Sequence, residues 1–195
     1  MNTIFDPMRI RDHFEESAQL AQDLLKDEEF LQALSRGAQV LVDALKSGHK
    51  VMSCGNGGSM CDAMHFAEEL SGRYRDDRKP FAAMSFSDPS AMTCIGNDYG
   101  FDKVFARQTQ ALGRPGDVLL AISTSGNSPN ILAAAKEAQL LGIKVLSLTG
   151  NGGGQLSGLA DVDVCVPWNG YADRIQEVHI RCIHAWIESI ESALA

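Results

Sequence analysis

The sequence predicts an α/β protein, a three-layer α/β/α sandwich with a five-stranded parallel sheet preceded by N-terminal helices. Five short apolar runs, bounded by glycine, aspartate or serine, alternate with longer segments of helical periodicity. This repeated strand–helix–strand order favours parallel strands with helices on both faces. The 195 residues suit one domain over residues 1–195, since no repeat or long linker divides them.

Two helices are expected before the sheet. Apolar residues at helical spacing predict one helix over residues 8–26 and a second over 27–46, with Gly48 near its end. We expect residues 8–47 to pack on the domain and on neighbouring subunits. The alternative is that they only cover one face of the sheet.

The expected strands and the remaining helices follow in turn. The strands are residues 50–54, 81–86, 117–122, 143–149 and 162–166. The helices are residues 59–73, 101–112, 129–141 and 171–194. Sheets of this kind bind ligands at the carboxyl ends of their strands, so the loops there are the first candidates for a site.

Composition and charge narrow the function. The net charge of −8 and the lack of a basic patch in the linear sequence argue against a nucleic-acid partner. No apolar run approaches the roughly 18 residues of a membrane span. Residues 1–8 lack the pattern of a signal peptide, so we expect a cytoplasmic protein without membrane contact. The five scattered cysteines contain no C-x-x-C and predict neither a disulfide framework nor a zinc ribbon.

The loop after the first strand, 55–59 (GNGGS), is a candidate anion-binding site. Glycines let the backbone approach a ligand, and the helix that follows offers free N–H groups. The loop is neither the dinucleotide fingerprint nor a Walker A loop. The alternative is a tight turn in which Ser59 is an ordinary N-cap.

The loop after the third strand gives a stronger signal, because four hydroxyl side chains crowd within six positions: Ser123, Thr124, Ser125 and Ser128. Pro129 suits a first helical turn, which makes Ser128 the expected N-cap. Hydroxyls and helix N–H groups can hold one phosphate without a lysine. The alternative is a polar surface loop.

Two further loops are less specific. Residues 96–100 form an expected turn that could present Asn97 and Asp98 to sugar hydroxyls. Residues 150–154 are glycine-rich with few side chains for chemistry, so we interpret them as structural.

The candidate proton-transfer groups lie on two helices. His65 and Glu69 are four residues apart and share a helix face, while His179 and His184 lie on the last helix. Ketose–aldose interconversion moves a proton between neighbouring carbons, with a carboxylate as base and a histidine able to shuttle the hydroxyl proton. Glu69 is the expected base and His184 the expected acid. The alternatives are a solvated helix edge at Glu68 and Glu69, and helix-packing histidines.

A metal site is a second interpretation of the same groups. His65, Glu69, Gln176 and His184 could bind zinc, with Cys61, one turn before His65, as a rival ligand. Glu69 and His184 would then be less available as base and acid. Whether such a zinc is catalytic or structural stays open.

From Phe14 to Leu194 the chain resembles the phosphoheptose isomerases of the sugar-isomerase (SIS) superfamily. The motifs that carry the resemblance are SCGNGGS (53–59), DAMHFAEEL (62–70), GND (96–98), STSGNS (123–128) and RIQEVHI (174–180). The serine loop alone indicates only the superfamily, whereas the two histidine-bearing helices narrow it to this family.

The resemblance implies a SIS fold in a homotetramer with active sites at subunit contacts. It implies isomerisation of sedoheptulose 7-phosphate to D-glycero-D-manno-heptose 7-phosphate through an enediol(ate), early in ADP-heptose and lipopolysaccharide biosynthesis. Glu69 would be base and His184 acid, with one zinc per subunit on His65, Glu69, Gln176 and His184. The residues that would contact the substrate are Asn56, Gly57, Gly58, Ser59, Asn97, Asp98, Ser123, Thr124, Ser125, Ser128 and Gln176. Arg73 could reach a neighbouring subunit's ligand or be a surface charge.

Three alternatives remain. A non-catalytic SIS adaptor that binds the replication initiator would resemble the isomerases less at Glu69 and His184. A sugar-phosphate-sensing regulator would usually carry a helix-turn-helix module, for which the chain has no room. An isomerase for another sugar phosphate, such as arabinose 5-phosphate or a hexose phosphate, would share the anion loops.

Overall fold

The computed structural model describes Asp6 and residues 8–195. Residues 1–5 and 7, on which the expectation about a signal peptide partly rests, lie outside the described residues. The middle layer is a parallel sheet in the order β2-β1-β3-β4-β5. Its strands are β1 Val51–Cys54, β2 Ala83–Ser85, β3 Val118–Ser123, β4 Lys144–Gly150 and β5 Val162–Val166. The predicted fold class and all five predicted strands are thereby confirmed, with ends that differ by at most two residues.

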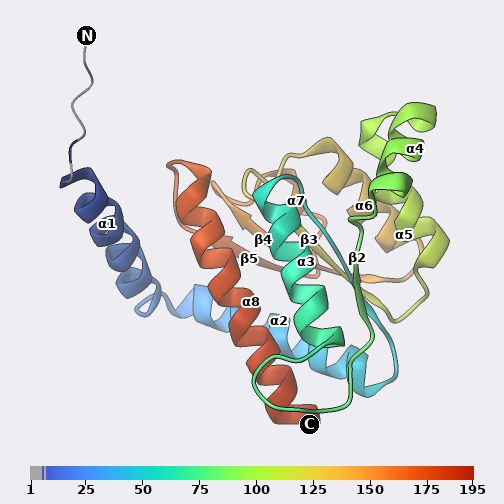
Figure 1. The fold of residues 1–195 in the computed structure, drawn as a ribbon, viewed down its shortest axis with the longest axis horizontal. Helices are drawn as coiled ribbons and strands as arrows, with labels where there is room; N and C mark the ends of the chain where they lie inside the picture. Colours follow the sequence, from blue (N-terminus) through green and yellow to red (C-terminus); the bar gives the residue numbers. More distant parts are fainter. Residues whose placement is uncertain (1–5, 7) are drawn as a thin grey trace.

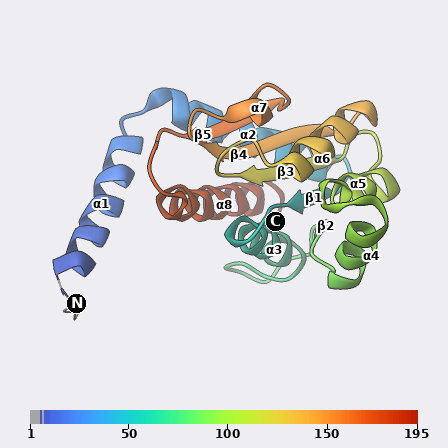
Figure 2. The same ribbon diagram turned by 90° about the horizontal axis from the view of Figure 1, so that it is seen from above.

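Helices cover both faces of the sheet (Figure 2). The first face carries α2 Glu28–Lys46, α3 Gly58–Ser71 and α8 Ala172–Leu194, and the second carries α5 Ala106–Leu112, α6 Pro129–Leu140 and α7 Gly154–Ser157. Side chains of β3 alternate between the two faces of the sheet, because successive residues of a strand point to opposite faces. Leu120 and Ile122 therefore join the first core, and Leu119 and Ala121 join the second.

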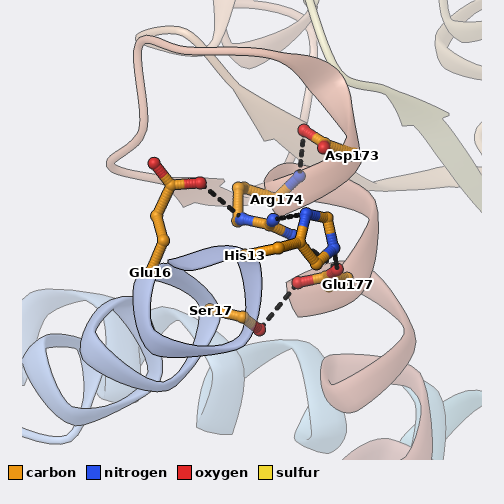
Figure 3. A network of polar contacts seen from close by, with 6 residues as sticks. All are labelled: His13, Glu16, Ser17, Asp173, Arg174 and Glu177. Atoms are coloured by element: carbon orange, nitrogen blue, oxygen red, sulfur yellow. Dashed lines mark hydrogen bonds and ion pairs between the residues drawn. The ribbon is translucent and has the colours of Figure 1, made fainter. Parts of the chain in front are cut away.

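Helix α1, Met8–Leu24, leans away from this sandwich (Figure 1). It contacts the domain through Leu20 and Leu24, which are buried in the first core, and through a polar network on α8. In that network the buried Arg174 donates to Glu16 at 2.8 Å and Ser17 donates to Glu177 at 2.7 Å (Figure 3). The side of α1 that carries Phe14, which is 70% exposed, has no partner within the described residues. Helix α2 begins after Asp27, the N-cap, whose carboxylate accepts from the N–H of Phe30.

Three local predictions are wrong. The expected turn at 96–100 is largely the end of an unpredicted helix, α4 Pro89–Tyr99. The expected helix 101–112 is broken into a 3₁₀ turn, Phe101–Lys103, and α5. The N-cap of α3 is Gly57, not Ser59, which lies buried inside the first turn.

The physical reason for missing α4 is that its apolar face is narrow: Met92 and Ile95 pack partly buried on the second core, and no residue of the helix is fully buried. Its start signal was nevertheless present. Asp88 caps the helix by accepting from the N–H of Ala91, and Pro89 occupies the first turn.

None of the described helices is both long and apolar enough to span a bilayer.

Candidate active site

The first glycine loop and the start of α6 are tied together by a pair of amides. Asn56 and Asn130 exchange reciprocal hydrogen bonds of 2.9 and 2.8 Å, and Asn130 is buried. The carboxyl ends of β1 and β3 are therefore held side by side. The amide of Asn56, predicted to contact sugar, is paired with Asn130 in this structure. Asn130 lies next to Pro129 and carried no signal of its own in the sequence.

The hydroxyl loop after β3 has the predicted form. Ser128 is the N-cap of α6 and Pro129 follows it at the first position. The Ser128 hydroxyl does not cap the helix; its Oγ lies 3.0 Å from Oγ of the buried Ser123. Gly126 has φ +63°, and a Cβ there would lie 1.9 Å from the Gly153 carbonyl, so only glycine fits this turn. In the first turn of α6, Pro129 has no N–H and the N–H of Ile131 donates to Oδ1 of Asn130 at 3.0 Å, so the helix dipole and the N–H of Asn130 are what this turn offers an anion.

The predicted acid–base groups converge between α3 and α8, which pack side by side (Figures 1 and 2). Nε2 of His65 lies 3.0 Å from Nε2 of His184 and 3.4 Å from Oε1 of Glu69. One imidazole nitrogen thus faces both predicted catalytic groups. This juxtaposition joins residues 119 positions apart in the chain.

The hydrogen bonding of the Glu69 carboxylate is incomplete. Its side chain is 15% exposed, and its buried Oε2 has no hydrogen-bond partner among the described residues. Glu68, on the neighbouring position, places Oε1 3.4 Å from Nδ1 of His65 and so orients that ring from its other side. Sequence reasoning took Glu68 for a solvated edge, and only the fold shows which ring atom it faces.

Asp62, one turn before His65, is a second carboxylate whose hydrogen bonding is incomplete. Burial raises its pKa to about 6, and the charge of His65 opposes that shift. Its buried Oδ2 also lacks a partner within the described chain. Asp62 and Glu69, two turns apart on α3, thus both have a buried oxygen without a hydrogen-bond partner. Packing of α3 against α8 does not require such unpaired carboxylates, which are typical of functional sites.

The donor atoms fit a zinc ion. A tetrahedral site with bonds of about 2.1 Å separates its ligand atoms by about 3.4 Å. The 3.0 and 3.4 Å separations around His65 Nε2 match that edge length, and an unpaired carboxylate oxygen adds a further acceptor. Donor atoms of His65, Glu68 and Glu69 also form a compact group within 4.8 Å. Neither His184 nor Cys61, which is free and exposed, belongs to that group.

Other predicted residues lie apart from this cluster. Gln176 packs against the first glycine loop, since a Cβ at Gly58 would lie 2.6 Å from its Nε2, and no hydrogen bond joins it to the histidines within the described chain. Asn97 and Asp98 are exposed on α4 and hydrogen-bond to each other at 2.7 Å. Arg73 is exposed and has no ion pair among the described residues.

No hydrogen bond among the described residues joins the hydroxyl loop to the cluster. His65 and Glu69 lie about 10 and 16 Å along α3 from Gly58, at 1.5 Å per residue. An open groove of about 540 Å³ beside His65 is lined by α3 and β2 residues and by none of Ser123–Ser128. A larger hollow of about 680 Å³ between α5 and α6 contains no predicted site residue.

His179 belongs to the core and not to the site. It is fully buried, and its Nε2–H donates to the carbonyl of Thr149 at 3.0 Å. Burial lowers its pKa to about 4, with that hydrogen bond opposing the shift. It is a packing histidine, as the alternative interpretation of the sequence allowed.

Comparison with known proteins first defines the class. The family model described as SIS domain matches residues 12–150. A curated relative from Tolumonas auensis, named phosphoheptose isomerase, is 56% identical over 91% of this chain and 92% of its own length. One from Aeromonas hydrophila with the same name is 54% identical over 95% and 97%.

Solved structures agree in fold. Phosphoheptose isomerase from Neisseria gonorrhoeae superposes with a TM-score of 0.88 at 42% identity, covering 95% of this chain and 98% of that one. The one from Francisella tularensis gives 0.91 at 36% identity, covering 97% and 100%. The chain therefore belongs to the phosphoheptose isomerase family of SIS domain proteins.

Proposed function

We propose that this chain is an aldose–ketose isomerase that converts sedoheptulose 7-phosphate to D-glycero-D-manno-heptose 7-phosphate through an enediol(ate). The observation that carries the proposal is the convergence of Glu69 and His184 on one nitrogen of His65. Relatives that share 52–56% of their residues with this chain are named for this isomerase activity.

The chemistry assigns one role to each group. Glu69 removes a proton from C1 of the ketose, and the electron pair forms the C1–C2 double bond of the enediolate. His184 moves the hydroxyl proton between the oxygens on C1 and C2. Glu69 then returns its proton to C2, which completes the aldose with no change in atoms or charge. The unpaired Oε2 of Glu69 is a free oxygen for that transfer.

The phosphate of the substrate is assigned to the hydroxyl loop. Ser123, Thr124, Ser125 and Ser128 belong to the loop that leads into α6, and the dipole of that helix favours an anion at its N-terminus. Local donors of this kind are needed because the chain as a whole is negative, at −8. Asn56, Gly57, Gly58, Ser59, Asn97, Asp98 and Gln176 are proposed to line the sugar.

We assign one zinc ion per subunit to His65, Glu69 and His184, with Gln176 as the fourth residue; this assignment competes with the acid–base roles of Glu69 and His184, because an atom bound to the metal cannot also carry the proton. When bound there, zinc would act as a Lewis acid toward the substrate's carbonyl or hydroxyl oxygens. Glu68 then orients His65 through Nδ1, as carboxylates do behind metal-ligating histidines.

A site assembled from two chains of a homotetramer is proposed because the hydroxyl loop and the cluster lie apart in one chain. The apolar side of α1 that carries Ile10 and Phe14, which are 53% and 70% exposed, supports the assembly. The polar network at Arg174 fixes α1 to its own domain and leaves that side free for other subunits (Figure 3).

The cytoplasm is the proposed compartment, and all five cysteines being free fits reducing conditions. The proposed metabolic place is an early step toward ADP-heptose and lipopolysaccharide. A non-catalytic adaptor is not favoured, because such a protein has no use for an incomplete carboxylate facing two imidazoles.

A substrate panel with known metal content tests the proposal. Purified protein, with zinc quantified, is given sedoheptulose 7-phosphate, arabinose 5-phosphate and hexose phosphates, and the aldose and ketose products are measured. Turnover of sedoheptulose 7-phosphate well above the others is expected. Turnover of a shorter sugar phosphate alone would show that the proposed substrate is wrong. Turnover of none of these sugars would refute the proposed isomerase activity.

A further inference from the structure

The loop of residues 72–82, which joins α3 to β2, crosses the C-terminal half of α8 (Figure 1). It carries Tyr74, Arg75 and Arg78, none of which belongs to the predicted site. The loop contacts α8 over the same stretch that bears His184, so its effect on that histidine can be followed contact by contact.

Arg78 fixes the loop at two points. Its side chain is only 4% exposed, and Nε donates to Oε1 of Glu191 on α8 at 2.8 Å. Nη2 donates at 2.7 Å to the backbone carbonyl of Glu69, and Nη1 at 2.9 Å to that of Leu70. These carbonyls end α3 and lack helical partners, so the guanidinium satisfies them. One buried side chain thus ties the loop to α3 and α8 together.

Tyr74 lies on the imidazole of His184. The two rings are 26° from parallel with centroids 5.8 Å apart, an offset stack. The His65 ring meets the same imidazole edge-on, at 71° and 5.2 Å. His184 is therefore held by one ring on its face and one at its edge.

His184 has few other restraints. Among the described residues its only hydrogen-bond partner is His65, and its χ2 angle belongs to the broad, weakly restrained class. A rotation about χ2 would turn Nε2 away from His65 and Glu69 without breaking any other hydrogen bond within the described chain. The Tyr74 stack opposes that rotation, and displacements of about 1 Å can cost 100-fold in rate.

We propose that Tyr74 is a positioning residue that holds the His184 imidazole in its working orientation, and that Arg78 holds Tyr74 there through the loop. The inference rests on the proposed function, because that function assigns proton transfer to His184. It predicts that the aromatic ring of Tyr74 matters and its hydroxyl does not.

Tyr74→Ala and Tyr74→Phe make the first comparison, with kcat and KM measured on sedoheptulose 7-phosphate. Tyr74→Ala should lower kcat about 30-fold and change KM less than about 3-fold, because the phosphate contacts are elsewhere. Tyr74→Phe should stay within about 3-fold of the parent. Equal kcat in the parent and Tyr74→Ala, or equal losses in both variants, would overturn the proposal.

Zinc binding gives a second readout that does not depend on turnover. Competition between each protein and a chromophoric chelator, with Zn²⁺ alone as the probe, should show about 10-fold weaker binding in Tyr74→Ala and no change in Tyr74→Phe. A parent that binds zinc but isomerises nothing would refute the proposed function, while this comparison would still decide the role of Tyr74. A parent that does neither would overturn both.

Arg78 and Arg75 form a matched pair in the same loop. Arg78→Ala should reproduce the losses of Tyr74→Ala in kcat and zinc affinity; if it does not fold, Arg78→Lys should show a smaller loss of the same kind. Arg75→Ala removes an exposed ion pair with Glu188 and a contact of 5.3 Å with the face of the Tyr74 ring, so it should show a smaller loss than Arg78→Ala. Greater losses of kcat and zinc affinity in Arg75→Ala than in either Arg78 variant would contradict the proposal that Arg78 holds the loop in place.

Discussion

Two polar clusters in this molecule differ in how completely their groups are paired. At the amino end of β3, Asp117 is buried, and its carboxylate accepts hydrogen bonds from the backbone N–H groups of Lys50 and Arg114 and pairs with the Lys50 ammonium. Between α3 and α8, Glu69 is also largely buried, yet Oε2 has no partner among the described residues. A fully paired carboxylate contributes to stability, whereas an incomplete one is available to a ligand.

The pKa of Asp117 agrees with this difference. Burial alone would raise it, but the side-chain hydrogen bond from Lys50 and the two backbone hydrogen bonds outweigh burial and lower it below its usual value. The ionised form is therefore favoured in the folded protein. For Asp62, in the incomplete cluster, burial prevails and the pKa rises to about 6.

The largest expected effect is on turnover, from Glu69→Gln. The amide keeps the shape of the side chain but cannot accept the C1 proton, so kcat should fall at least about 1,000-fold. Phosphosugar binding, followed by calorimetry, should be largely intact, and the unfolding temperature should not fall. Zinc content must be measured beside the rate. Near-normal rates would remove Glu69 as the base.

The converse substitution, Asp117→Asn, should affect stability and leave turnover unchanged. Replacing a buried, paired carboxylate leaves Lys50 without its counter-ion and should cost about 3 to 4 kcal/mol of unfolding free energy. Chemical denaturation of the two proteins at pH 7 measures the difference. The gap should narrow as the pH falls, because a lowered pKa contributes stability above the unfolded-state pKa and loses it in acid. An unchanged stability with lost turnover would reverse the roles of the two clusters.

A smaller effect is expected from the buried His179. Its pKa is about 4 in the folded chain and about 6.5 when unfolded, so the unfolded state takes up the proton first. The stability that this residue contributes is complete above pH 6.5 and declines between pH 6.5 and 4, by about 2 to 3 kcal/mol. His179→Gln should flatten this part of the stability curve. Because Asp62 titrates in the same range in the opposite sense, the quantity to measure is the difference between the two proteins. Parallel curves would show that His179 does not titrate as described.

The smallest expected loss is at the cap of α4. Asp88→Ala removes the acceptor of the Ala91 N–H and should destabilise the N-terminal turn of the helix. Hydrogen exchange of the α4 amides should speed up about 5-fold while the core is unaffected. Unchanged exchange would indicate that α4 is held by contacts other than its cap.

The sequence predicted what depends on local pattern. The apolar runs located all five strands, and the spacing of His65 and Glu69 placed both on one face of α3. Helix α4 was missed because it packs only the partly buried Met92 and Ile95 on the second core and has no fully buried residue. Asn130, Glu68 and Tyr74 were missed as contributors because their significance lies in contacts with residues that only the fold brings near. Gln176 and the hydroxyl loop were placed at one site with the histidine pair by resemblance, which stays a prediction, because no hydrogen bond among the described residues joins either of them to the pair.

A site shared between chains is the central claim that remains to be measured. Glu69→Gln damages the cluster, and Ser125→Glu places a negative charge where the phosphate should bind. Mixed oligomers of the two inactive variants, purified through two different tags, contain sites whose two halves come from different chains. If each site takes its hydroxyl loop and its cluster from separate subunits, about a quarter of the sites are intact and about a quarter of the parent rate should return. Mixed oligomers no more active than either variant alone would contradict a shared site.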